Sequence, residues 1–158
     1  MNFEITLRPV GPQDEEFLYR VYASTREEEL APVLWDVLQK EAFLRMQFSL
    51  QHKYYTEVFA SASFMIIELG GRSIGRLYRE RKEDELNLID LALLPEYRGR
   101  GIGTFLLKSM QAEAGDNNVP MRVYVERFNK AQSLYKRLGF TTIGDTDVYL
   151  LMEWKPAG

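Results

Sequence analysis

One segment constrains the fold more than any other: a nearly continuous apolar run over residues 86–94, followed by glycines at alternate positions. Such a run fits a strand that is buried on both faces. Gly99, Gly101 and Gly103 come next, and residues 101–114 then repeat apolar side chains at helical spacing. Glycine lets a backbone approach a ligand closely, and a helix start presents N–H groups with no partner in the helix. The segment therefore predicts a phosphate or pyrophosphate site.

The helix that follows the glycines has a predicted inward face of Ile102, Phe105, Leu106 and Met110, and Gly115 is expected to end it.

Arg98 and Arg100 flank the glycines and supply positive charge suited to phosphate oxygens. The alternative is an ordinary strand-to-helix turn with two solvated arginines. The segment lacks the G-x-x-x-x-G-K-[ST] pattern of nucleoside triphosphatases. A dinucleotide fingerprint also fits poorly, because the glycines do not follow the first strand of the chain.

Periodicity and turn residues predict the remaining elements. Strands are expected at 3–8, 64–69, 73–78, 121–125, 140–143 and 148–154, and helices at 14–25, 36–55 and 130–138. Turns, loops or charged tips are expected at 9–12, 27–32, 70–71, 79–85 and 144–145.

This order predicts one domain over residues 1–158 with an α/β fold of the α+β kind. Its centre is a mixed, mostly antiparallel sheet of about seven strands flanked by about four helices.

Composition excludes several kinds of site. The chain has no cysteine, which excludes disulfides, thiolate catalysis and thiolate metal sites. Its one histidine, His52, gives little material for a catalytic triad or a multi-histidine metal site, and no metal is expected. A net charge of −3 disfavours nucleic acid as a partner. Neither a signal peptide nor a membrane span is apparent, so a cytoplasmic location is expected.

Two motifs carry a resemblance to a known family. The first is Arg98-x-x-Gly101-x-Gly103, preceded by Pro95, and the second runs from Asn129 through Ala131, Leu134 and Tyr135 to Gly139-Phe140. Together they resemble the [QR]-x-x-G-x-[GA] and N-x-A-x-x-L-Y-x-x-x-G-F signatures of the GCN5-related N-acetyltransferase family. The element order is also similar to that family's over nearly the whole chain.

The resemblance implies acetyl-coenzyme A as co-substrate. Its pyrophosphate would bind the backbone amides of Arg98, Gly99, Arg100, Gly101, Ile102, Gly103 and Thr104. The strand before the glycines would separate from the next strand, and its backbone near Leu91 and Leu93 would pair with the pantetheine arm. The Leu93 amide would polarise the thioester carbonyl, as an oxyanion hole does.

Two residues of the second motif have both a structural and a functional interpretation. Asn129, with Gln132 three residues on, fits a helix-capping box, and the resemblance adds a hydrogen bond to the pantetheine arm. Tyr135 fits a core tyrosine with a satisfied hydroxyl. The resemblance instead places that hydroxyl beside the coenzyme A sulfur, as the general acid for the leaving thiolate.

Direct attack by a primary amine in a ternary complex is expected, since no cysteine is available for an acyl-enzyme. The base is not identified by the sequence: Asp90 and Glu126 are candidates, and each also fits a solvated carboxylate at a strand end. His52, between polar neighbours, fits an exposed surface residue.

The acceptor remains open. Glu28, Glu29, Trp35 and Tyr55 lie in the region that this family uses for acceptors, and acids beside aromatic rings could hold a cationic amine. Solvated acids and core aromatics are the alternative. The second hypothesis for the chain is a non-catalytic acyl-coenzyme A sensor on the same fold. The third is nucleic-acid binding through its basic residues. Whether the chain forms a homodimer stays open.

Overall fold

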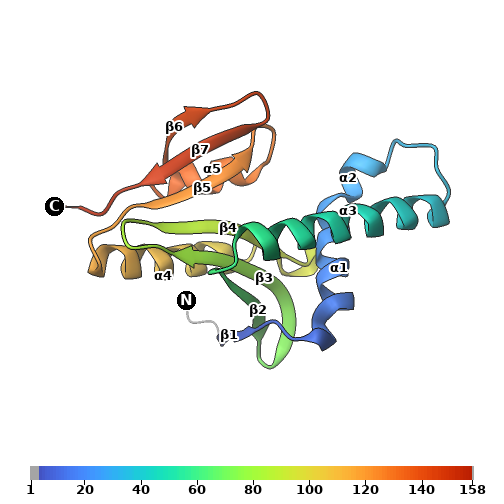
Figure 1. Ribbon diagram of the computed structural model, residues 1–158, viewed down its shortest axis with the longest axis horizontal. Helices are drawn as coiled ribbons and strands as arrows, with labels where there is room; N and C mark the ends of the chain where they lie inside the picture. Colours follow the sequence, from blue (N-terminus) through green and yellow to red (C-terminus); the bar gives the residue numbers. More distant parts are fainter. Residues whose placement is uncertain (1–3, 158) are drawn as a thin grey trace. The chain divides into compact units, whose positions relative to one another are not determined.

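The computed structural model describes residues 4–157, in which one strand, three helices, three strands, a helix, a strand, a helix and two strands follow in turn (Figure 1). The chain divides into two compact units. The first comprises the described part of Met1–Leu77 together with Ala92–Tyr97, and the second comprises Tyr78–Leu91 and the chain from Arg98 onward. Strands β3 (Arg72–Arg81) and β4 (Leu86–Leu93) therefore each contribute to both units.

In the first unit, β1 (Ile5–Pro9) pairs antiparallel with β2 (Ser63–Leu69). The two-residue turn Gly70-Gly71 then leads into β3, and both of its glycines have positive φ, which L side chains rarely adopt. Ile66 and Ile67 of β2 are fully buried, so this hairpin forms part of the core.

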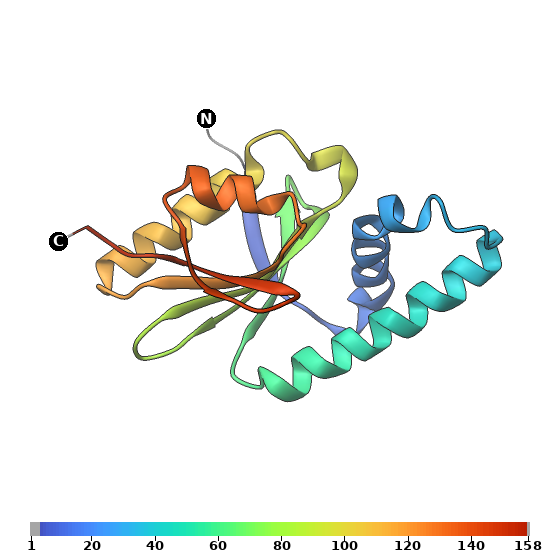
Figure 2. The same ribbon diagram turned by 90° about the horizontal axis from the view of Figure 1, so that it is seen from above.

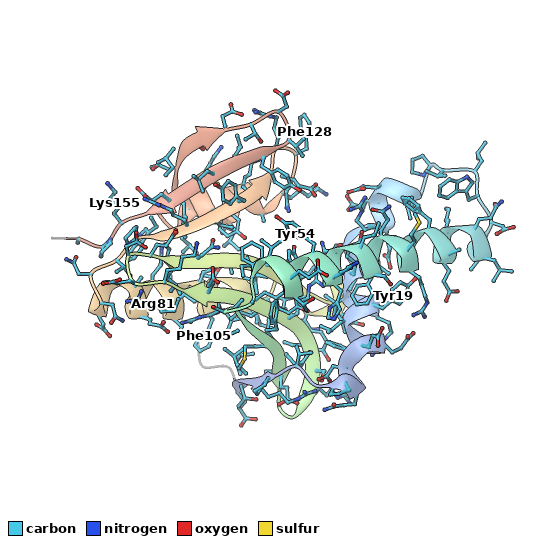
Figure 3. The ribbon with its side chains drawn as sticks, viewed as in Figure 1. Tyr19, Tyr54, Arg81, Phe105, Phe128 and Lys155 are labelled. Atoms are coloured by element: carbon cyan, nitrogen blue, oxygen red, sulfur yellow. The ribbon has the colours of Figure 1, made fainter. Side chains whose placement is uncertain are left out.

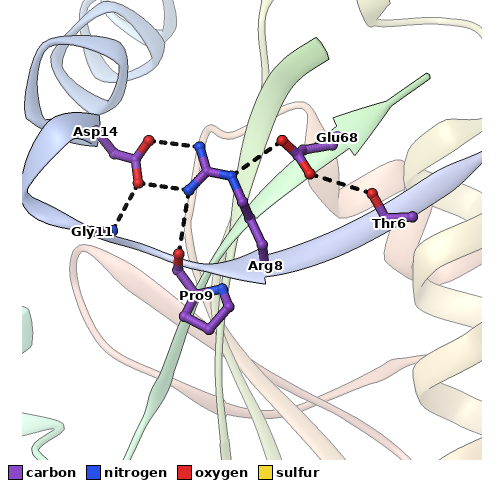
Figure 4. A network of polar contacts seen from close by, with 6 residues as sticks. All are labelled: Thr6, Arg8, Pro9, Gly11, Asp14 and Glu68. Carbon is purple, nitrogen blue, oxygen red and sulfur yellow. Dashed lines mark hydrogen bonds and ion pairs between the residues drawn. The ribbon is translucent and has the colours of Figure 1, made fainter. Parts of the chain in front are cut away.

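An ion-pair network joins β1 to β2 and to the start of the first helix (Figure 4). Arg8 donates from Nη1 and Nη2 to the two carboxylate oxygens of Asp14, at 2.8 and 2.7 Å, and from Nε to Glu68 at 3.1 Å. The Gly11 amide donates to the same Asp14 carboxylate at 2.7 Å. The Arg8 hydrogen bonds lower the pKa of Asp14 against the opposing effect of burial, and the Gly11 amide adds to the lowering.

Three helices follow β1. They are α1 (Glu15–Thr25), α2 (Glu27–Leu30) and α3 (Val37–Val58). The loop predicted at 27–32 is wrong at its start, because α2 lies there. Three consecutive glutamates and a leucine favour a helical turn, and it ends just before Pro32.

Helix α3 begins where Asp36 predicts it. The Asp36 carboxylate accepts from the Gln39 amide at 2.8 Å, and the Gln39 side chain accepts from the Asp36 amide at 3.0 Å. The helix packs against α1 (Figure 2). The contact includes Phe48, whose ring lies 5.8 Å from that of Tyr19 and 5.9 Å from that of Tyr22.

The second unit is built around β5 (Met121–Glu126). This strand pairs parallel with β4 and antiparallel with β7 (Tyr149–Trp154), which in turn pairs with β6 (Thr141–Asp145). The same unit contains α4 (Ile102–Asp116) and α5 (Ala131–Arg137). Its core includes Leu86, Leu88, Leu107, Met121 and Met152, all at most 1% exposed.

Several details of the second unit differ from the sequence predictions. Gly115 lies inside α4 and does not end it, and Phe105 is exposed and not inward. The turn between β6 and β7 falls after Asp145, because a bulge places Gly144 inside β6. Only Leu86 and Leu88 of β4 are fully buried, and the rest of the strand is half-buried. Strand β3 also continues to Arg81, into the region predicted as a charged tip.

The strand order is β1-β2-β3-β4-β5-β7-β6. This confirms the predicted mixed sheet of seven strands in an α/β fold, with antiparallel pairs on both sides of the parallel pair of β4 and β5. The short α2 adds a helix to the four predicted. The single domain over residues 1–158 stays a prediction.

Candidate active site

The glycine loop has the backbone conformation that its sequence predicts. A short 3₁₀ turn, Pro95–Tyr97, follows β4, and Gly99 and Gly101 then adopt φ values of 69° and 85°. A Cβ at Gly99 would meet no atom within 4 Å, so glycine is required there for its conformation and not for space.

Gly101 is the N-cap of α4, and it provides no side-chain hydrogen bond to the first turn. Arg98, Gly99, Arg100 and Gly101 are exposed, whereas Ile102 is 1% exposed and anchors the helix start in the core. The first-turn amides of α4 therefore donate no hydrogen bond to a capping side chain. The same end of this 15-residue helix carries the positive end of the helix dipole. That geometry suits a pyrophosphate.

Strands β4 and β5 separate within the second unit. Their parallel register joins Leu86 to Met121, Asn87 to Arg122 and Leu88 to Val123, and it goes no further. β4 nevertheless continues past Asp90 and Leu91, and β5 continues to Glu126. In Figure 1 the two strands run apart beyond the paired residues. The gap is an open edge at which an extended ligand can form strand-like hydrogen bonds.

Tyr135 of α5 is buried in the same unit, with 6% of its surface exposed. Burial raises the pKa of its phenol well above the ordinary value, and the negative charge of Asp90 raises it further. Asp90 is half-buried on the part of β4 that has left β5. The second unit thus brings Tyr135 and Asp90 within electrostatic reach of each other.

The end of α5 fixes the tyrosine's backbone. Phe140 donates its amide to the Tyr135 carbonyl at 3.0 Å, and their rings lie 5.5 Å apart. Gly139, at φ 94°, turns the chain there, and a Cβ on it would lie 3.3 Å from Cδ1 of Trp154.

Asn129 lies one residue before Lys130, the N-cap of α5, and the capping box that its spacing with Gln132 predicts is not formed. Its Oδ1 accepts from the Ala131 amide at 2.8 Å, in an Asx turn. The Gln132 side chain donates instead to the carbonyls of Glu126 and Arg127. This hydrogen bond orients the Asn129 carboxamide, and Asn129 is exposed. Its Nδ2 group remains as a hydrogen-bond donor.

Leu93 belongs to the first unit, where it lies over a residue that the sequence reasoning missed. A Cβ on Gly75 of β3 would lie 2.3 Å from the Ala92 carbonyl oxygen and 3.1 Å from the Leu93 Cα. Only glycine lets β4 pass so close, and the Leu94 amide donates to the Ile74 carbonyl at 2.9 Å just beyond. An isolated glycine within a strand pattern is the signal that could have identified it.

Glu126, the second base candidate, is exposed at the end of β5. The β5–β7 register places it opposite Tyr149 and places Tyr124 opposite Leu151, so these side chains share one face of the sheet. Tyr124 is 59% exposed and Tyr149 43% exposed. Figure 3 shows Phe128, 92% exposed, at the same end of these strands. The sequence reasoning missed these aromatic residues beside Glu126.

The four acceptor candidates lie in the first unit and do not form one cluster. Glu28 and Glu29 are exposed on α2, and Glu29 pairs with Arg26 at 3.0 Å. The Trp35 ring lies 5.3 Å from that of Phe43, whereas Tyr55 contacts Phe59. Trp35 and Tyr55 lie near opposite ends of α3, which at 1.5 Å per residue separates them by about 30 Å.

A shallow depression of about 320 Å³ in the first unit is lined by other residues: Glu15, Glu16, Arg45, Phe48 and Ser49.

Across residues 4–157, no helix combines the length and the apolar character that crossing a membrane requires. Nor does this described part contain a group of three or more His, Cys, Asp or Glu side chains placed to hold a metal ion.

Residues 60–142, just over half of the chain, match the model of the acetyltransferase (GNAT) domain family. A search of curated proteins gave no significant match.

Solved structures resemble the chain over nearly its whole length. The N-acetyltransferase PaiA of Thermoplasma acidophilum, in complex with coenzyme A, is 23% identical with a TM-score of 0.70, over 96% of this chain and 98% of that one. An acetyltransferase of Thermus thermophilus is 23% identical with a TM-score of 0.68, over 96% of both chains. Ard1 of Thermoplasma volcanium is 18% identical with a TM-score of 0.62, over 98% and 99%. At these identities the likeness shows the fold alone.

Proposed function

Because the chain belongs to the GNAT acetyltransferase family, we propose that it transfers an acetyl group from acetyl-coenzyme A to a primary amine, by direct attack in a ternary complex. One observation carries the proposal: the second unit contains both a helix start without a capping side chain, at α4, and two strands that separate, β4 and β5. One suits a pyrophosphate and the other suits the extended arm attached to it.

The pyrophosphate is assigned to the backbone amides from Arg98 to Thr104. The left-handed Gly99 and Gly101 support this assignment, since they shape a loop in which successive amides can point to one side. The guanidinium groups of Arg98 and Arg100 add charge-assisted contacts to the phosphate oxygens.

The pantetheine arm is assigned to the open edge of β4 beyond Leu88, where Leu91 and Leu93 would pair with its amides. Asn129 donates from Nδ2 to the arm, because its Oδ1 is engaged by the Ala131 amide. The Leu93 amide polarises the thioester carbonyl and stabilises the oxyanion that forms there. Gly75 supports this role by letting the backbone at Ala92 and Leu93 lie close over β3.

The chemical step begins with removal of a proton from the amine, which arrives mostly as ammonium because its pKa is near ~10.4. Asp90 or Glu126 accepts that proton directly or through water. The amine nitrogen then bonds to the acetyl carbon and the C–S bond breaks. Tyr135 donates its proton to the leaving thiolate. It regains a proton from the former amine nitrogen, which loses its second proton as the amide forms. Protons and charge therefore balance.

The amine itself is assigned to the region of Glu126, Tyr124 and Tyr149, with Glu28, Glu29, Trp35 and Tyr55 as further candidates. A carboxylate beside exposed aromatic rings favours a cationic acceptor. A cytoplasmic location stays a prediction.

The test combines binding with turnover. Acetyl-coenzyme A binding is measured by calorimetry, and thiol release is followed against a panel of polyamines, amino acids, peptide N-termini and lysine. Gly101→Glu places a carboxylate against the pyrophosphate and is expected to abolish binding. Gly115→Glu, exposed in the same helix, is the control of equal charge and should bind as the wild type does.

The outcomes separate the hypotheses. Wild-type protein that fails to bind acetyl-coenzyme A, or Gly101→Glu protein that binds it normally, contradicts the cofactor site. Tight binding with no turnover on any amine favours the acyl-coenzyme A sensor.

A further inference from the structure

Helix α3 exposes much more apolar surface than a helix packed in a core. It has 22 residues, of which only Phe48 is buried. α1 lies against one side of it (Figure 2). The Phe48 ring contacts and the ion pair from Arg45 to Glu16 at 2.8 Å join the two helices. The opposite side of the helix faces solvent.

That solvent-facing side carries an apolar ridge. Leu38, Ala42, Met46 and Leu50 recur at every fourth residue, and the three larger ones are 77%, 54% and 59% exposed. At 3.6 residues per turn these four span roughly 120° of the helix surface, on the side away from Phe48. Tyr54, 54% exposed, continues the spacing along the helix, and Leu34, 101% exposed, lies in the loop just before α3.

We infer that a second copy of this chain covers the ridge, with the two α3 helices antiparallel about a twofold axis between Ala42 and Met46. The ridge has the same order of large and small residues from either end, because the axis relates Leu38 to Leu50 and Ala42 to Met46. A twofold interface requires such self-complementarity. Ridges of every fourth residue also form the commonest class of helix packing in globular proteins.

Charge selects the antiparallel orientation. Exposed Asp36 lies eight residues before the axis and exposed Lys53 nine residues after it. Antiparallel pairing brings Asp36 toward the partner's Lys53 at both ends of the interface, and it aligns the helix dipoles favourably. Parallel pairing would oppose Asp36 to Asp36 and Lys53 to Lys53.

The surface is also of adequate size. At roughly 100 Å² of apolar surface for each large exposed side chain, the ridge and Tyr54 supply on the order of 400 Å². The exposed polar residues beside it, Gln39, Ser49 and Lys53, bring the patch toward the ~800 Å² that each partner of a standard interface buries. Ala42 at the centre allows the two axes to approach closely.

A lipid surface fits this face less well than a second copy does. Helices that lie on membranes carry lysine and arginine on their polar side. α3 mixes both signs of charge, with Glu41 and Glu57 beside Lys40, Arg45 and Lys53.

The first experiment measures the mass of the full chain by sedimentation velocity and light scattering over a wide range of concentration. The wild type is expected to be dimeric. Met46→Glu places two carboxylates beside the axis and should weaken the dimer on the order of a hundredfold or more. Ile143→Glu, on an apolar β6 residue that is 48% exposed, is the matched control and should stay dimeric.

The second experiment tests orientation. Lys53→Glu should weaken the dimer by repulsion from Asp36, and Asp36→Asn in that background should restore it, since asparagine also caps a helix. Circular dichroism checks that each variant is folded. A wild type that stays monomeric, including one that is monomeric but binds anionic vesicles, overturns the proposal, as does a folded Met46→Glu variant that dimerises normally.

Discussion

At the scale of single residues, the surroundings of Tyr135 suit the proton-donor role proposed for it. Burial and the charge of Asp90 raise the pKa of its phenol, so it stays protonated throughout the range in which amines are acetylated. Tyr135→Phe is expected to lower kcat by about 10²-fold or more, with little change in acetyl-coenzyme A affinity. Steady-state thiol release and calorimetry measure the two quantities.

Tyr19→Phe is the control for Tyr135, because Tyr19 is also a buried tyrosine but packs against Phe48 in the first unit and has no part in the proposed proton transfer. Unchanged kcat in Tyr135→Phe would remove the general-acid role. Wild-type kcat should also show no decline from Tyr135 ionisation up to about pH 10, the ordinary pKa of tyrosine.

Asp14 controls stability in acid. Its pKa is lowered in the folded state, chiefly by Arg8, so its contribution is complete above its unfolded pKa of ~3.9 and is lost as pH falls through the lower folded value. Asp14→Ala should lower the free energy of unfolding by about 2 kcal/mol at neutral pH. It should also flatten the acid side of the stability profile, measured by urea unfolding at a series of pH values. A variant that keeps the wild-type acid dependence would contradict this.

At the scale of elements, two glycines of the α4 region have opposite requirements, Gly101 at the N-cap and Gly115 inside the helix. Gly115 is helical, and a Cβ there meets only Pro156, at 4.0 Å, so Gly115→Ala should stabilise the protein by about 0.4–1 kcal/mol. Gly101, at the N-cap, has a left-handed conformation, and Gly101→Ala should destabilise the protein by roughly 1–2 kcal/mol. Thermal unfolding of both variants measures the difference, and equal signs would contradict the backbone explanation.

Elements with strong periodicity or a clear cap could be predicted from the sequence. Asp36 starts α3 as expected, and the glycine loop leads into α4. The predictions failed where the structure did not follow a local sequence signal. Gly115 has the composition of a helix stop, but the backbone continues to Asp116, and Asn118 takes the positive φ in the turn that follows. Asn129 and Gln132 have capping-box spacing, but the Gln132 side chain finds carbonyls before the helix.

The candidate site divides in the same way. The glycine loop and the start of α4 could be predicted, because glycines, arginines and a helix start lie together in sequence, and the binding of a cofactor there stays a prediction. Gly75 is visible in the sequence only as an isolated glycine in a strand pattern, and nothing there singles out the tyrosines beside Glu126, because the contacts of these residues depend on the backbone of β4 crossing β3 and on the register of β5 with β7. Such contacts join residues that are distant in sequence.

At the scale of the whole molecule, cofactor binding should stabilise the fold. A ligand at a hundredfold excess over its Kd adds about 2.7 kcal/mol to the free energy of unfolding. For a chain of this length that raises Tm by roughly 5–10 °C. Differential scanning calorimetry with and without coenzyme A measures the shift. Gly101→Glu is the control, and the same shift in that variant would contradict binding at the glycine loop.

The close approach of Gly139 to Trp154 has an optical consequence. The chain contains two tryptophans, and the other, Trp35, lies outside the second unit. Trp35→Phe would leave a single fluorophore whose indole lies against the end of α5, the helix that carries Tyr135. Its emission wavelength and quenching would report on that helix in real time, so stopped-flow mixing could time changes around Tyr135 without an added dye.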